Sequence, residues 1–344
     1  MSILYLVIYL YSFIYYPDQL TIILTLFSNI AVSSEKQIEL LTHKGDLVAS
    51  IRHSLSHASA LAFDSIHSVL YVSDTSERNV SIFRIHVTKD GKSGLLQPVV
   101  QSNVKFIEGL AYDAVSSTIF WSTGSEKTIM SARLDENKTE LAVGSVLHKF
   151  SDELVYGIAV DSCRGKLYWT NCNVAKPSIE RSDLNGNNRE VVVSTRLFRP
   201  MAVTISQADR LMYWVEEKTG YLFSVERCAL DGSNRQTIVL SENQQPLALA
   251  VSGSRLYWTD DMHTSVWSVM HSNPDLQMPM VETRLVKTYS ERSTILGGVI
   301  SAYQDSPLDE NVCRNMIDLR TKVSLHFTIY SSISAVANLQ PPKP

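Results

Sequence analysis

Polar side chains recur at one position of a repeated apolar segment, two or three residues after a pair of aromatic residues. Asp74 and Asp260 occupy this position in two segments, and Thr123, Asn171 and Glu216 occupy it in three others. Carboxylates and amides that converge from several strands can hold a calcium ion, which would suit hydrolase or lactonase chemistry. A catalytic position does not vary among four residue types within one chain. We therefore expect these side chains to hydrogen-bond one repeat to the next, because buried polar groups need partners.

Three further aspartates, Asp64, Asp113 and Asp161, end the first apolar run of their repeats and are expected to be turn residues. No consistent set of Glu, Asn and Asp marks the starts of these runs, as an axial calcium site would require. We predict no catalytic residue, no bound metal and no cofactor. A calcium-dependent esterase or lactonase is the alternative.

The four cysteines form no CxxC pair and are too few for a disulfide scaffold. Cys163 and Cys172 flank a predicted strand that would hold them roughly 17–20 Å apart. A disulfide needs Cα atoms within about 7 Å of each other. A bridge from Cys172 to Cys228 in the next repeat and two free thiols both remain open.

The elements that position these residues are themselves repeated. The first aromatic residues are Tyr71, Phe120, Tyr168, Tyr213 and Tyr257, spaced by 44 to 49 residues, and the second are Trp121, Trp169, Trp214 and Trp258. A period in the forties indicates propeller blades or helical repeats. Runs such as "GIAV" and "KLYWT" lack a 3.6-residue period, which favours strands. Asn-Gly and Asp-Gly turns follow in several copies and predict further hairpins, so each unit has four antiparallel strands.

Two incomplete units lie at the ends of the repeat region. Residues 35–51 resemble the outer half of a unit, and residues 296–304 resemble a first strand. Joining them in one blade would close a ring. The sequence therefore predicts an all-β fold, a six-bladed β-propeller over residues 35–304, in which the repeated aromatic side chains fill the wedges between blades.

The first 33 residues are almost wholly apolar and predict a signal peptide, with cleavage near Ala31 or Ser33, or an uncleaved hydrophobic segment. Sequons at Asn79 and Asn137 fit a secretory route. The net charge of −4 and the pI near 6.1 argue against nucleic acid as a partner. We expect the protein at the cell membrane or secreted.

The motifs "LYWTD", "LYWTN", "MYWVE", "GIAVD" and "LDGSNR" resemble the class B (YWTD) repeats of the low-density-lipoprotein receptor family over residues 37–304. The resemblance implies a six-bladed propeller. Residues 160–189, 220–236 and 246–268 are most similar to an insect member of this family. That similarity implies a cell-surface protein with an EGF-like region and one membrane span after the propeller, associated with germ-cell development in oogenesis and spermatogenesis.

The chain departs from the family pattern after the propeller. Residues 306–313 resemble the start of an EGF-like module, but no cysteine follows Cys313, which we expect to be unpaired. The tail, 305–344, reads as truncated or irregular, and its apolar part has no basic residues after it to stop membrane transfer. A family-type membrane anchor is therefore not supported in this chain.

Receptors of this family can release ligands in acidic compartments through histidine protonation. His53, His57 and His67 lie close together in the sequence, and histidine titrates between pH 5 and 8. An acid-sensitive cluster is one interpretation of these three residues. Surface histidines without a role are the other.

One face of the propeller is the expected binding surface. Residues that precede first strands or follow second strands should line it: Glu108, Tyr156, Arg199, Glu216 and Asp261. Tyrosine and arginine are common interface anchors, although ordinary rim residues would also occupy these places. The predicted function is non-enzymatic binding of an extracellular protein ligand, and a basement-membrane linker module is a further alternative.

Overall fold

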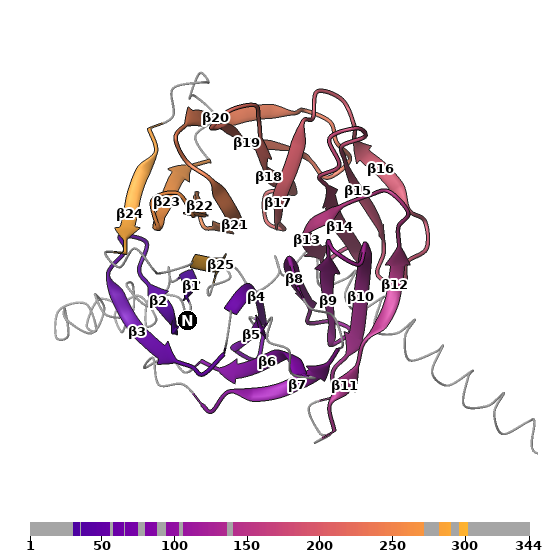
Figure 1. Ribbon diagram of the computed structural model, residues 1–344, viewed down its shortest axis with the longest axis vertical. Coiled ribbons are helices and arrows are strands. Elements are labelled where there is room, and N and C mark those ends of the chain that lie inside the picture. The colour runs from indigo at the N-terminus through magenta and orange to yellow at the C-terminus, as the bar shows by residue number, and fades with distance from the viewer. Residues whose placement is uncertain are drawn as a thin grey trace, which may run out of the picture.

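The computed structural model describes residues 30–301, apart from gaps at 35, 56–57, 65, 75–79, 88–93, 103–105, 136–139, 272–281 and 290–295. Every regular element in this part of the chain is a strand. The sheets surround one axis as six blades (Figure 1). The expectations for residues 1–29, for the tail 305–344 with Cys313, and for Asn79, Asn137 and His57 lie outside the described residues.

Each blade is a sheet whose strands follow one another outward from the axis. In blade 1 these are β25 (Leu296–Ser301), β1 (Ile30–Ser34), β2 (Gln37–Leu41) and β3 (Leu47–Arg52). In blade 2 they are β4 (Ala58–Asp64), β5 (Val69–Asp74), β6 (Val80–His86) and β7 (Gln97–Gln101). In blade 3 they are β8 (Gly109–Asp113), β9 (Thr118–Thr123), β10 (Thr128–Arg133) and β12 (Ser145–Lys149).

Blades 4 to 6 follow the same plan with consecutive strands. Blade 4 contains β13 (Val155–Asp161), β14 (Lys166–Asn171), β15 (Ser178–Asp183) and β16 (Glu190–Val193). Blade 5 contains β17 (Arg199–Ser206), β18 (Leu211–Glu217), β19 (Leu222–Ala229) and β20 (Gln236–Glu242). Blade 6 contains β21 (Pro246–Ser252), β22 (Arg255–Asp260), β23 (Ser265–Met270) and β24 (Arg284–Thr288). The predicted six-bladed propeller is confirmed.

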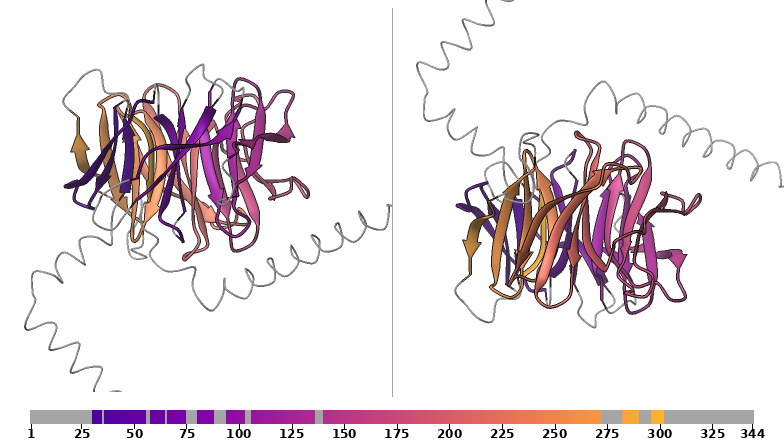
Figure 2. Two further views of the ribbon diagram at one scale, coloured as in Figure 1. Left: turned by 90° about the horizontal axis from the view of Figure 1, so that it is seen from below. Right: turned by 90° about the horizontal axis from the view of Figure 1, so that it is seen from above.

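The six first strands form the inner ring. They contact one another in the order β25, β4, β8, β13, β17, β21 and back to β25. Their close approach requires small residues, because a Cβ on Gly157 would lie 2.6 Å from the Met201 carbonyl oxygen of blade 5. Seen edge-on, the sheets stand side by side around the ring (Figure 2).

The N-terminal boundary differs from the prediction. Ile30–Ser34 is not the end of a leader segment but a fully buried strand, β1, which pairs with β25 on one side and β2 on the other. The propeller therefore begins by Ile30 rather than at residue 35. Cleavage near Ala31 or Ser33 would cut the strand that joins the two ends of the ring, so the predicted cleavage position does not fit this fold.

Blade 2 also differs from the expected four strands. A short strand, β11 (Ala142–Val143), leaves blade 3 and pairs in parallel with the outer strand β7 of blade 2. It covers an edge that would otherwise present unpaired backbone groups. Gly144 then passes over the Trp121 ring, where an added Cβ would lie 2.6 Å from the indole.

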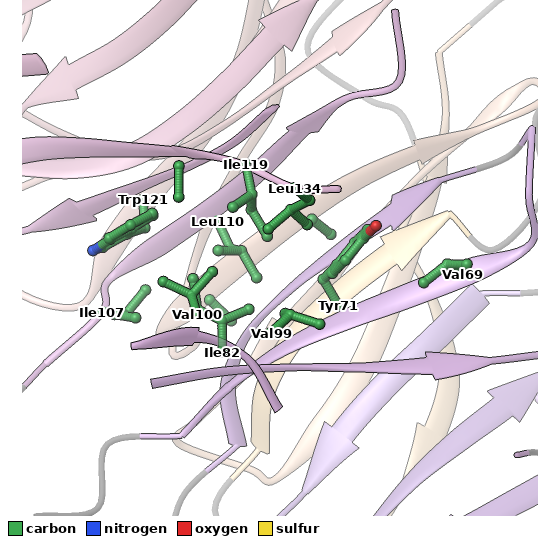
Figure 3. Close-up of a cluster of buried hydrophobic side chains, with 13 residues drawn as sticks. Val69, Tyr71, Ile82, Val99, Val100, Ile107, Leu110, Ile119, Trp121 and Leu134 are labelled. Atoms are coloured by element: carbon green, nitrogen blue, oxygen red, sulfur yellow. The ribbon is translucent and has the colours of Figure 1, made fainter. Parts of the chain in front are cut away.

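Among the described residues the buried hydrophobic side chains form six clusters, and each lies between two neighbouring blades. In the cluster of Figure 3, Tyr71 from blade 2 and Trp121 from blade 3 lie in one interblade space. Three more clusters repeat this pairing of a first aromatic residue with the tryptophan of the following blade: Phe120 with Trp169, Tyr168 with Trp214, and Tyr213 with Trp258. The predicted filling of the wedges is confirmed.

We expect the closing strand to depend on Ser33. Its hydroxyl accepts the buried Gly298 N–H at 2.8 Å, so Ser33→Ala would leave that donor unpaired and cost about 1–3 kcal/mol of unfolding free energy. Urea unfolding measures the loss. Ser50→Ala is the control, because the Ser50 hydroxyl bonds Gln37 at the surface and should matter little. Equal losses for the two variants would contradict the placement of β1.

Candidate functional site

A bulge in the first strand presents the residues at one end of the axis. In blade 4 the register of β13 and β14 shifts between Val155 and Ile158, so Tyr156 and Gly157 together lie opposite Thr170. The Thr170 hydroxyl accepts the Gly157 N–H at 2.9 Å and donates to the Met201 carbonyl of blade 5. Similar register shifts occur in the first strands of blades 2, 5 and 6. Such bulges bend a strand and redirect its side chains.

The end of the propeller where first strands begin and second strands end is called the leading face here. The Tyr156 carbonyl accepts the Ser122 hydroxyl of blade 3, which fixes the backbone of this residue between two blades. The Tyr156 ring packs against the cluster between blades 5 and 6. Burial raises the pKa of its phenol, and nearby Glu108, Arg199 and Asp261 influence it electrostatically.

Four of the five predicted surface residues therefore gather around the axis. We call Glu108, Tyr156, Arg199, Glu217 and Asp261 the axial cluster; they come from blades 3, 4, 5 and 6. Arg199 is half-buried and forms an ion pair with Glu217, in which Nη1 lies 2.9 Å from Oε2. The Arg199 guanidinium also lies beside the Cys172 thiol, whose pKa is raised by burial.

Glu108 is the unusual member of the axial cluster. Its side chain is half-buried, and burial raises the pKa of its carboxyl group. Within the described part of the chain, no hydrogen bond or ion pair reaches this carboxylate. A Cβ on neighbouring Gly124 would lie 3.3 Å from Glu108 Oε1, so the glycine leaves room for the carboxylate.

Glu216 was predicted as a surface residue, and this was wrong. Its side chain is fully buried, and one carboxylate oxygen accepts the backbone N–H groups of Phe198 and Arg199. The other oxygen accepts the Trp214 indole N–H at 3.2 Å. The next residue, Glu217, joins the axial cluster instead. Strand alternation, which turns consecutive side chains to opposite faces, could have indicated this exchange.

Three residues equivalent to Glu216 (Thr123, Asn171 and Asp260) form hydrogen bonds within one blade and not between blades as expected. Asn171 Oδ1 accepts the Leu154 N–H at 3.0 Å, which ties the loop before β13 to the end of β14. Asp260 Oδ1 accepts the Gln245 N–H at 2.8 Å in the same way. Asp74 and Thr123 are likewise buried. These bonds shape the loops of the leading face.

The three first-strand aspartates are turn residues, as predicted. Asp64 accepts the Ile66 N–H at 2.9 Å, Asp113 accepts the Ser116 N–H at 3.1 Å, and Asp161 accepts the Arg164 N–H at 3.2 Å. All three are fully buried. They stabilise the turns at the opposite end of the propeller from the axial cluster.

The described histidines do not form the expected group. His53 precedes β4 and bonds the Ser34 carbonyl through Nε2, and burial lowers its pKa. His67 follows β4 and pairs with Asp64, so the two imidazoles lie at opposite ends of one strand. These positions do not support a shared acid switch.

Of the two alternatives left open for Cys172 and Cys228, a disulfide or two free thiols, the structure shows free thiols. Cys172 and Cys228 are buried free thiols, so no bridge joins them, and burial raises the pKa of the Cys228 thiol to about 12. Cys163 is disulfide-bonded. Since Cys172 is free, the doubted bridge between Cys163 and Cys172 is absent.

Exposed apolar side chains lie on the loops of the leading face in blades 3 to 6, the blades that also supply the axial cluster. These loops precede first strands or follow second strands, and their exposed side chains, the apolar ring, are Phe106, Leu154, Val174, Phe198, Tyr221 and Met262. Val174 and Tyr221 are the most open, with 60% and 70% of their surface exposed. Exposed apolar patches that adjoin polar residues are common at protein-interaction sites.

Two kinds of site are absent from the described residues. No group of three or more His, Cys, Asp and Glu side chains there could hold a metal ion. That part of the chain also contains no helix of the length and apolar character that a membrane span requires.

The chain is similar to several curated proteins. It is 33% identical to the protein cueball of Drosophila persimilis over 267 residues and 35% identical to that of Drosophila yakuba over 241 residues. These alignments cover 77% and 69% of this chain but only 41% and 37% of the relatives, so the chain spans about two-fifths of their length. No family model matches the chain.

Solved structures share the fold. A chain in the crystal structure of a nidogen–laminin complex superimposes with a TM-score of 0.63 and 25% identity, covering 80% of this chain and 98% of that one. The similarity to this YWTD propeller and the similarity to the cueball relatives together identify the family. The propeller belongs to the class B (YWTD) repeat family of the low-density-lipoprotein receptor. A TolB protein of Agrobacterium tumefaciens, with a TM-score of 0.52 and 12% identity, shares the propeller fold alone.

Glu108 gives a test of the site that does not require a ligand. Because burial raises its pKa, the folded YWTD propeller binds this proton more tightly than the unfolded chain does. Above its raised pKa in the folded chain, the charged carboxylate therefore lowers the free energy of unfolding. Below the pKa of the same group in the unfolded chain, this loss of stability disappears. We expect Glu108→Gln to raise the urea midpoint at pH 7 and to leave it unchanged in acid.

Glu190→Gln is the matched control, because Glu190 lies on the outer strand of blade 4 and forms an exposed ion pair with Arg181. It should give no gain at pH 7. A Glu108→Gln variant that is less stable than the unchanged chain at pH 7 would contradict the description of Glu108 as a half-buried, unpaired charge.

Proposed function

We propose that the leading face binds a protein ligand and that the chain acts as a non-enzymatic, receptor-like propeller. The apolar ring carries this proposal, because its six exposed apolar side chains lie on the same loops of blades 3 to 6 that supply the axial cluster. Aromatic side chains and arginine commonly supply most of the binding energy at such surfaces. Phe106, Phe198 and Tyr221 in the ring and Arg199 in the axial cluster are of these types.

The nidogen–laminin structure supports this mode of action, because it is a complex of proteins that contains a chain with the same propeller fold. The same likeness favours the alternative of a basement-membrane linker. The TolB likeness extends to the fold alone and identifies no reaction. A calcium-dependent esterase or lactonase is therefore the weaker alternative.

The cellular setting is part of the proposal. We place the chain in the secretory pathway, at the cell membrane or secreted, on the apolar residues 1–29 and the sequons at Asn79 and Asn137. The resemblance to cueball suggests a role in oogenesis and spermatogenesis. These proposals draw on the cueball relatives, and this chain matches only about two-fifths of their length.

Val174→Asp tests the binding face. We expect the purified full chain to bind insect ovarian cells and the variant to bind at least about tenfold more weakly, because a charge would be buried in an apolar contact. Flow cytometry over a concentration series measures both affinities. Val191→Asp is the matched control, since Val191 is 56% exposed on the outer strand of blade 4 and Val174 is 60% exposed.

Other outcomes separate the alternatives. Equal weakening by the two variants would contradict binding through the leading face. Binding to a basement-membrane extract but not to cells would favour the linker. Turnover of aryl esters together with calcium-dependent stability would favour the enzyme.

A further inference from the structure

We propose that the axial cluster receives a lysine or arginine side chain of the protein ligand, while the apolar ring contacts the residues that flank it. This inference rests on the proposed binding function and specifies the chemistry of its ligand. Charge complementarity at the centre of the leading face supports it.

The charge balance of the axial cluster favours a cation. Its described members supply three carboxylates, from Glu108, Glu217 and Asp261, and one guanidinium, from Arg199. Arg199 is already paired with Glu217, with 2.9 Å between Nη1 and Oε2. Glu108 and Asp261 therefore have no cation among the described residues, so the axial cluster itself has more negative than positive groups.

The Glu108 carboxylate differs from an ordinary surface charge because it is half-buried. A carboxylate that is partly removed from water and unpaired is costly, and an incoming cation relieves that cost. Asp261 is exposed at the end of β22, where it can approach the same cation from another blade. Charge-assisted hydrogen bonds to two carboxylates are stronger than those between neutral groups.

Tyr156 is the second, independent feature that indicates a ligand. Its ring is partly buried against a core cluster, and its hydroxyl makes no hydrogen bond to another described residue, so the hydroxyl is available to a ligand. The Thr170 and Ser122 hydroxyls bond the N–H and the carbonyl of the peptide between Tyr156 and Gly157, so the backbone that carries the phenol is held in place before any ligand arrives. The hydroxyl can accept a hydrogen bond from an ammonium or guanidinium group.

The test uses a random 12-residue peptide library displayed on phage and selected on the full chain. We expect the enriched peptides to contain a lysine or arginine next to apolar residues. For synthetic copies, replacing that basic residue by norleucine should weaken binding about tenfold or more, as loss of a charged hydrogen bond does. Glu108→Gln should weaken binding to the same extent, whereas Glu190→Gln on the outer strand should not.

Urea unfolding of the Glu108→Gln variant is the control for its fold. The variant should be at least as stable as the original chain at pH 7. Peptides that lose binding with Val174→Asp but carry no basic residue would overturn this inference and leave the proposed function standing. Failure to enrich peptides sensitive to Val174→Asp would count against both. Binding unchanged by Glu108→Gln would overturn the inference alone.

Discussion

Neighbouring side chains of a strand point to opposite faces, and this constraint organises the propeller. Tyr168 therefore packs against blade 5 while Trp169 packs against blade 3, so one dipeptide fills two interblade spaces. The tyrosine hydroxyl extends the contact by donating to the Leu230 carbonyl of blade 5 at 3.2 Å. Arg181 donates to the same carbonyl at 2.8 Å. Each blade is thus held on both sides by its second strand, and no blade has a core of its own.

The third position of the same strand connects this packing to the binding surface. Thr170 and Ser122 bond the first-strand bulge of blade 4 from two blades, and Tyr156 lies in that bulge. The fourth position then ties the preceding loop to the strand end, through Asn171 or Glu216. Loops that carry the apolar ring are therefore held by the residues that build the blades. A rigid face of this kind loses little entropy when it binds a ligand.

The large aromatic residues made the fold predictable, because they recur at blade spacing and only a wedge between sheets needs them. The closing strand was missed because Ala31 and Val32 replace the aromatic pair, and Ile30–Ser34 resembles a leader sequence in composition. Of the candidate site, the positions before first strands were predictable from topology. The exchange of Glu216 for Glu217 could have been predicted from the alternation of side chains along β18. The strand β11 depends on contacts between blades, which local sequence patterns do not indicate.

Site-specific photo-crosslinking on cells tests the central claim, that the leading face is the binding surface. Benzoyl-phenylalanine would replace Phe198 or Met262 in the apolar ring, or Val191 or Leu285 on outer strands, all of which are at least 39% exposed. The account predicts one shared crosslinked product from the two ring positions and none from the outer strands. A product from Val191 or Leu285 without one from the ring would contradict it.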